Sequence, residues 1–128
     1  MNTIIINILC EGQTEERFVK EVLKPYFKSA GIVLKHRLLV TSKKKNAHGG
    51  MLSYSQVKGD LTKWMKENKG RASETHFYTT MFDFYALPDD FPGFSEANGC
   101  HDPYQKVKRL EEAFQTDIDN LAFIPYIQ

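Results

Sequence analysis

The chain has 128 residues, of which 26% are charged and 41% hydrophobic, and its formal net charge is +1. This length allows one domain with a single core but not two, and the near-zero net charge indicates no class of partner by itself. No apolar stretch reaches 18 residues, which excludes a membrane-spanning helix, and no signal peptide is recognisable at the start. Cys10 and Cys100 have neither metal-ligand spacing nor a disulfide framework, so we expect a cytoplasmic protein.

The first predicted element is a strand over residues 3–9, which are apolar nearly throughout and rich in β-branched side chains. That pattern is typical of a central strand covered on both faces. Thr14 is expected to cap the helix that follows, with Glu15 and Glu16 in the first turn, where the helix dipole favours negative charge. Apolar residues then repeat at helical spacing, and Pro25 predicts a kink or an early end of this helix.

The middle of the chain predicts a second strand over residues 32–40, a polar segment over residues 41–50 and a helix over residues 53–68. A third strand is predicted over residues 75–84, which are rich in aromatic and β-branched side chains. A loop is expected after it, because this part of the chain contains the breakers Pro88, Pro92, Gly93 and Gly99.

Asp102 and Pro103 form a favourable N-cap and N1 pair for a last helix that runs to about Thr116, and residues 121–127 predict a final strand. The order β-α-β-α-β-α-β predicts an α/β fold with a mostly parallel sheet and helices on its faces. We expect one domain over residues 1–128. Because it ends in an apolar strand, we expect it to be truncated at the C-terminus, as a fragment of a longer protein.

Two predicted strands deliver a carboxylate to their ends. Glu11 follows the first strand and precedes Gly12, and Asp83 interrupts an apolar and aromatic strand. An unpaired carboxylate is costly to bury, so Asp83 is expected at the strand end, in a pair or on a metal. Ligands bind outside the carboxyl ends of strands in open α/β sheets, so the two acids are candidates to share Mg²⁺ or Mn²⁺. The alternative for Glu11 is a solvated turn residue.

Three further carboxylates are candidate metal ligands. Glu15 is expected in the first turn of the helix after Glu11, and its alternative role is to interact with the helix dipole. Asp89 and Asp90 follow Asp83 closely enough to reach the same place. Their alternative role is turn formation after a proline, which is common for aspartate.

A basic segment between the second strand and the following helix is a candidate nucleic-acid contact. It contains Lys43, Lys44, Lys45 and His48, and the histidine is followed by two glycines. Lysines and a closely approaching backbone suit a phosphate backbone. The alternative is an ordinary solvated loop. The sequence contains no P-loop, no Rossmann glycine pattern and no Gly-x-Ser-x-Gly elbow.

Five ordered motifs resemble the bacterial family called domain of unknown function 4276. They are CEGQTEERFV at residues 10–19, HGGMLSY at 48–54, TTMFDFYALP at 79–88, DFPG at 90–93 and FIPYIQ at 123–128. That family is similar to Toprim domains, the α/β metal-binding module of topoisomerases, primases and certain nucleases. Its members often occur beside ATPase genes in phage-defence settings, so the resemblance implies a partner ATPase.

In Toprim enzymes a Glu after the first strand acts as general acid or base, and an Asp-x-Asp after a later strand binds Mg²⁺. By resemblance Glu11 matches the Glu and Asp83 the first Asp, whereas Tyr85 occupies the place of the second. The resemblance therefore implies a Mg²⁺-dependent nuclease. The alternative is a non-catalytic Toprim-like module that binds an ATPase partner or nucleic acid, which the departure at Tyr85 and the early end of the chain favour; a third is that this short form is inactive alone.

Overall fold

The computed structural model describes residues 2–39 and 53–128. Three strands form a parallel sheet in the order β2-β1-β3, which confirms the predicted α/β class and parallel pairing. Their bounds are β1 Thr3–Cys10, β2 Val33–Leu38 and β3 Glu74–Met81. The helical elements are α1 Gln13–Phe18, η1 Val19–Leu23, α2 Lys24–Ser29, α3 Tyr54–Glu67, η2 Phe84–Ala86, α4 Phe94–Asn98 and α5 Pro103–Ile118.

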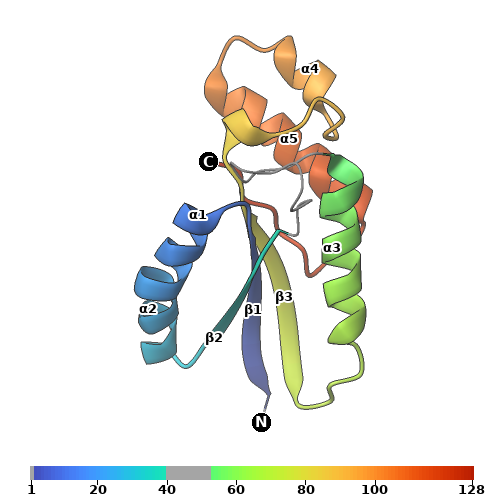
Figure 1. The fold of residues 1–128 in the computed structure, drawn as a ribbon. Coiled ribbons are helices and arrows are strands. Elements are labelled where there is room, and N and C mark those ends of the chain that lie inside the picture. Colours follow the sequence, from blue (N-terminus) through green and yellow to red (C-terminus); the bar gives the residue numbers. More distant parts are fainter. Residues whose placement is uncertain (1, 40–52) are drawn as a thin grey trace, which may run out of the picture.

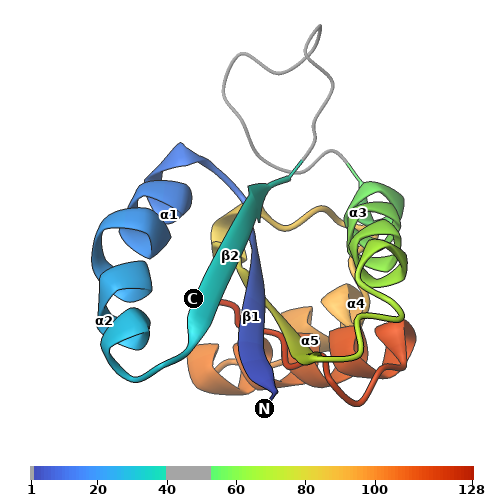
Figure 2. The same cartoon turned by 90° about the horizontal axis from the view of Figure 1, so that it is seen from below.

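The helices cover the two faces of the sheet unequally. α1, η1 and α2 lie on one face, and α3 and α5 lie on the other (Figures 1 and 2). Side chains on β1 alternate between the two layers: Ile8 and Cys10 pack with Val19 of η1, whereas Leu9 packs with Val57 and the rest of the larger core. Because β1 is buried on both faces, its sequence is apolar nearly throughout, as predicted.

The first helical stretch runs from α1 through η1 to α2 without a break in the chain, and η1 is a π-helix. The prediction that Thr14 caps it was wrong. The N-cap is Gly12, which makes no side-chain capping bond, so Thr14 already lies within the helix. Pro25 does not end the helix either, because the π-helical segment comes immediately before it and Pro25 falls in the first turn of α2. The wider π turn before Pro25, in which the N–H of Lys24 bonds to the carbonyl of Val19, is the local adjustment that accompanies the proline.

The predicted final strand is present only in part. Residues 121–127 lie along the free edge of β3, but they form two isolated parallel bridges, Tyr78 with Phe123 and Phe82 with Ile127. Between these bridges the hydroxyl of Thr80 accepts from the backbone N–H of Tyr126 and donates to its carbonyl, at 3.0 and 2.9 Å. A side chain therefore replaces the regular ladder at the centre of this segment.

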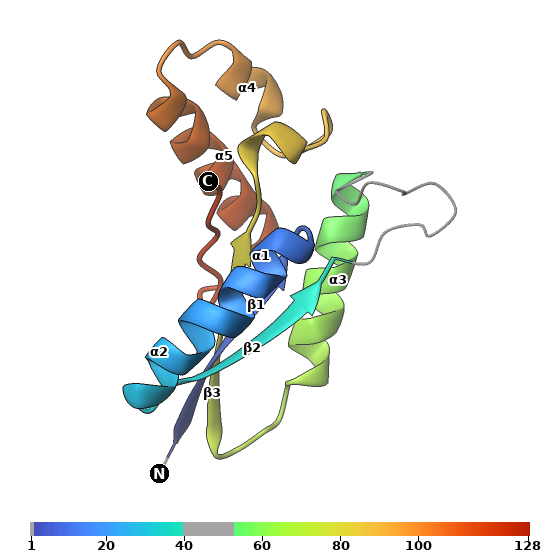
Figure 3. The ribbon, with the colours of Figure 1, turned by 60° about the vertical axis from the view of Figure 1, so that its left-hand side comes forward.

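The connection after β3 contains a helix that the sequence analysis did not predict. α4 and η2 lie beyond the carboxyl end of β3 (Figure 3). Gly93 precedes α4 with φ of 80°, and a Cβ there would lie 2.9 Å from the Cβ of Ala113 on α5. Glycine therefore permits both the left-handed turn and the close approach of α5. The predicted cap of α5 is confirmed, since Asp102 accepts from the backbone N–H of Tyr104 at 3.0 Å.

Within the described ranges, none of the helices combines the length and the apolar character needed to cross a membrane.

Candidate active site

The carboxyl ends of β1 and β3 lie side by side. Cys10 pairs with Met81 in the parallel register, and the backbone N–H of Glu11 donates to the carbonyl of Met81 at 3.2 Å. Two residues beyond Met81, the last residue of β3, the backbone N–H of Asp83 donates to Oε1 of Glu11 at 2.9 Å. Glu11 and Asp83, predicted as a pair, are 72 residues apart in sequence. They lie together at the carboxyl end of the sheet.

The carboxyl ends of β1 and β3 also mark the point where the order of strands switches from one side of β1 to the other. From β1 the chain passes through α1 and α2 to β2 on one side, and β3 is the neighbour of β1 on the other side. The segments that leave β1 and β3 consequently cover opposite faces, as the separate cores show. A crevice opens outside the strand ends at such a point, and ligands of open α/β folds bind there.

Glu11 occupies an electrostatically unfavourable position for an ionised carboxyl. Burial raises its pKa above the ordinary value, and the negative charges of Glu15 and Asp83 raise it further. The hydrogen bond from the backbone of Asp83 opposes this shift by favouring the charged form. Acidic groups held together with raised pKa values are typical of functional sites, where a cation relieves their repulsion.

Glu15 lies at the same turn, as predicted, and Gly12 makes room for it. A Cβ at residue 12 would come within 3.2 Å of Oε1 of Glu15, so the carboxylate of Glu15 lies against the backbone between Glu11 and the helix. Gly12 was not among the predicted site residues. Its place directly after Glu11, at the turn into the helix, was the feature of the sequence that could have indicated a close approach there.

Cys10, the last residue of β1, lies near the same negative charges. Burial raises the pKa of its thiol to about 12, with further contributions from the charges of Glu16 and Glu15. A thiol with this pKa stays protonated at neutral pH, and metal ligation and nucleophilic attack require the thiolate. Cys10 is therefore a small buried side chain rather than a metal ligand or nucleophile at neutral pH.

Asp83 has a second contact that fixes its side chain. It is the N-cap of η2, and its Oδ1 accepts from the backbone N–H of Tyr85 at 3.1 Å. The side chain of Tyr85, at the position where the resemblance places a second aspartate, is 91% exposed. The structure thus gives Asp83 an ordered carboxylate and supplies no carboxylate from residue 85.

Asp90 makes a structural contact away from this cluster. Both of its carboxylate oxygens accept from the backbone N–H of Tyr54, at 3.0 and 3.3 Å, at the first residue of α3. Ser53 at the N-cap position makes no side-chain capping bond, so Asp90 performs that function from a distant part of the chain. Asp89 is exposed in the same turn. Whether either residue reaches a bound metal stays a prediction.

Replacing Asp90 with alanine is expected to lower the free energy of unfolding by about 1 kcal/mol, the usual effect of losing a helix N-cap. The matched control is Asp89→Ala, which removes a neighbouring exposed carboxylate and is expected to change stability by less than about 0.5 kcal/mol. Urea denaturation followed by circular dichroism measures both. Equal losses in the two variants would contradict the capping role of Asp90.

The candidate nucleic-acid contacts Lys43, Lys44, Lys45 and His48 lie outside the described residues. The segment that carries them joins the end of β2 to the start of α3. The assignment of these four residues therefore stays a prediction.

The residues of the cluster suit a hard divalent cation. Mg²⁺ is usually bound by one or two carboxylates together with waters and substrate phosphates, and Glu11 and Asp83 supply two. Among residues 2–39 and 53–128, which the structure describes, no hydrogen bond reaches Oε2 of Glu11 or Oδ2 of Asp83. In those same ranges no three His, Cys, Asp or Glu side chains form a ready-made metal cage. The chemistry of these two carboxylates therefore fits the oxygen ligands that such a cation prefers.

Comparison with known proteins gives one match. The family model described as "Domain of unknown function (DUF4276)" matches residues 10–128. A search of curated proteins and a search of solved structures each found no match. The matched region begins at the end of β1, directly before Glu11, and includes Asp83.

Proposed function

Because the chain belongs to the DUF4276 family and holds Glu11 beside Asp83 at the reversal point of its sheet, we propose that it is a Mg²⁺-dependent phosphodiesterase acting on nucleic acid. The observation that carries the proposal is the hydrogen bond from the backbone N–H of Asp83 to the Glu11 carboxylate. It joins two candidate ligands from different strands into one acidic cluster where α/β folds bind ligands.

In this proposal Glu11 positions and deprotonates the attacking water. Its raised pKa brings the carboxyl closer to neutral pH, where a general base exchanges protons most effectively. Asp83 holds the cation, and its bond to the N–H of Tyr85 keeps it oriented for that task. Bound Mg²⁺ would stabilise the charge that develops on the phosphate. Glu15, Asp89 and Asp90 remain candidates to complete the ligand set, and Lys43 to Lys45 with His48 to hold the nucleic-acid backbone.

A second candidate function is a non-catalytic Toprim-like module that binds a partner ATPase or nucleic acid. The specific observation in its favour is Tyr85, which replaces the aspartate expected by resemblance and whose side chain points into solvent. Both functions fit a cytoplasmic role in a bacterial defence system, which the family resemblance suggests.

Cation binding and nicking separate the two functions. We expect the purified protein to bind Mn²⁺ in isothermal titration calorimetry, and Asp83→Asn to weaken this binding because it removes the carboxylate that holds the cation in this proposal. With Mg²⁺ or Mn²⁺ it should nick supercoiled DNA or cleave single-stranded RNA, and EDTA should stop the reaction. No Mn²⁺ binding, together with intact binding of nucleic acid, would favour the module over the enzyme.

A further inference from the structure

The outer edge of the sheet, at β2, is open. β2 pairs with β1 on one side, and within the described residues no strand pairs with its other side. An edge strand presents N–H and C=O groups that can pair with an added strand. Val33 at the start of β2 is 42% exposed, so an added strand could cover its side chain.

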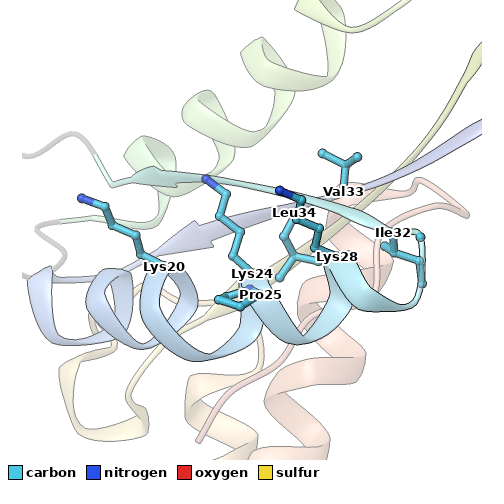
Figure 4. Close-up of a pocket in the computed structure, with 8 residues that line it drawn as sticks. Lys20, Lys24, Pro25, Lys28, Ile32, Val33 and Leu34 are labelled. Carbon is cyan, nitrogen blue, oxygen red and sulfur yellow. The ribbon is translucent and has the colours of Figure 1, made fainter.

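A groove with an apolar floor and a basic rim runs along this edge, between the first helical stretch and β2. Its floor contains Pro25, Ile32, Val33 and Leu34. Figure 4 shows Lys20, Lys24 and Lys28 extending from the helix toward β2. These lysines recur every four residues, so they form a row about 6 Å apart along one face of the helix.

A second basic groove borders the opposite face of β2, and Lys24 lines both. The cations that line it from β2 and from the end of α3 are Lys35, Arg37 and Arg71. Arg37 is held in place, because its guanidinium lies 4.7 Å from the ring centroid of Trp64 and donates to Glu67 at 2.7 Å. Basic side chains therefore line both faces of β2 at this edge.

The charge at this edge is far from the average of the molecule. Together the two grooves are lined by six Lys and Arg side chains and a single carboxylate, that of Glu67, whereas the whole chain has a net charge of only +1. The pKa of His36 on β2 is lowered by burial and by the charges of Lys24 and Lys20, and the nearby carboxylate of Glu16 opposes this shift.

We propose that the open edge of β2 binds an extended acidic strand of a partner protein by adding it to the sheet. The added strand would pair with the free backbone of β2, as in other cases of strand addition. Side chains alternate between the faces of a strand, so apolar residues would occupy the floor over Pro25 and Ile32. Acidic residues on the other face would meet Lys24, Lys35 and Arg37, which line the second groove.

Two alternative occupants fit the edge less well. A second copy of this chain would bring one basic edge against another, and like charges across paired strands are destabilising. A nucleic-acid backbone would match the lysines but would use neither the free backbone of β2 nor the apolar floor of the groove. An acidic strand uses all three features.

The test measures binding of the full chain to a fluorescein-labelled peptide in which glutamate and valine alternate. We expect saturable binding in fluorescence anisotropy, and slower hydrogen exchange of the backbone amides of residues 33–38 when the peptide is bound. Lys24→Glu, which reverses the charge shared by both grooves, should weaken binding by about tenfold or more. The matched control is Lys108→Glu on the exposed side of α5, which should leave binding unchanged.

A peptide of the same charge with prolines in place of two valines should fail to bind, because proline cannot complete the ladder. Three results would overturn the proposal. They are no binding of the glutamate–valine peptide, binding without protection of residues 33–38, and Lys24-dependent binding of an oligothymidylate in place of the peptide. The last result would identify the edge as a phosphate-backbone track.

Discussion

The Glu11→Gln protein is expected to lose metal-dependent cleavage by roughly 10²–10⁴-fold, the usual contribution of a general acid or base. Glutamine keeps the Oε1 atom that accepts from the N–H of Asp83, so the local geometry is retained while the charge and the proton-accepting group are removed. Asp83→Asn is the corresponding change at the cation site. It keeps an acceptor for the N–H of Tyr85 and removes the charge.

The stability of Glu11→Gln distinguishes a lost function from a damaged fold. Because the folded-state pKa of Glu11 is raised, its contribution to stability is fully present below the unfolded pKa and is lost as the pH rises through the folded pKa. At neutral pH the ionised carboxylate is therefore a destabilising group. We expect Glu11→Gln to be at least as stable as the unmodified protein at pH 7, and to lack that decline in stability.

Nicking assays and thermal unfolding, performed on the same preparations, measure both effects. The matched control is Glu112→Gln on α5, an exposed glutamate outside the cluster, which should keep full activity. Glu11→Gln combined with Asp83→Asn should be little worse than either change alone, since residues that act as one unit are not additive. Full activity in both single variants would remove these two residues from the proposed mechanism.

Replacing Phe114 with alanine is expected to have the largest effect on stability, a loss of about 3–5 kcal/mol. Phe114 lies fully buried on α5. Its ring lies 4.9 Å from those of Phe91 and Phe123 and 6.0 Å from that of Phe82, between ring centroids. The residue thus joins α5, the connection after β3 and the C-terminal segment. A loss of this size is a large part of the total stability of an ordinary domain.

The consequence extends to the candidate site, because Phe82 directly precedes Asp83 and stacks on Phe114. Urea unfolding measures the loss, and cation binding measures whether the carboxylate remains placed. Phe18→Ala is the matched control, since Phe18 on the first helical stretch is 45% exposed and should lose less than about 1 kcal/mol. Equal losses at Phe18 and Phe114 would show that the aromatic cluster is not the main core.

Part of this architecture follows from local sequence signals. The apolar run of β1, the cap at Asp102 and the alternation of helices and strands each depend on neighbours a few residues away. The same holds for Glu11, which directly follows the apolar run of β1. Asp83 was expected to interrupt a strand over residues 75–84, whereas β3 ends at Met81 and Asp83 lies just beyond it. The errors were also local in origin: Thr14 was a plausible cap, but the helix begins one residue after Gly12.

Other features depend on contacts between distant segments, and no local pattern reveals them. Asp90 reads as a turn residue, yet it caps α3 from 36 positions away. The C-terminal segment reads as a strand, yet the hydroxyl of Thr80 takes over part of its pairing. Likewise, the order of elements along the chain does not reveal that β2 lies at the side of the sheet, with basic side chains beside its unpaired edge.

The sequence by itself therefore determined that two strands end in carboxylates, because strand ends are fixed by short apolar runs. Only the tertiary structure decided that these strands are neighbours, with the N–H of Asp83 bonded to the carboxylate of Glu11. The physical reason is that strand order depends on how helices pack over the two faces of the sheet, a non-local balance of burial. That balance partly buries Glu11 and brings it near Glu15 and Asp83, so burial first, and then the two negative charges, raise the pKa of Glu11.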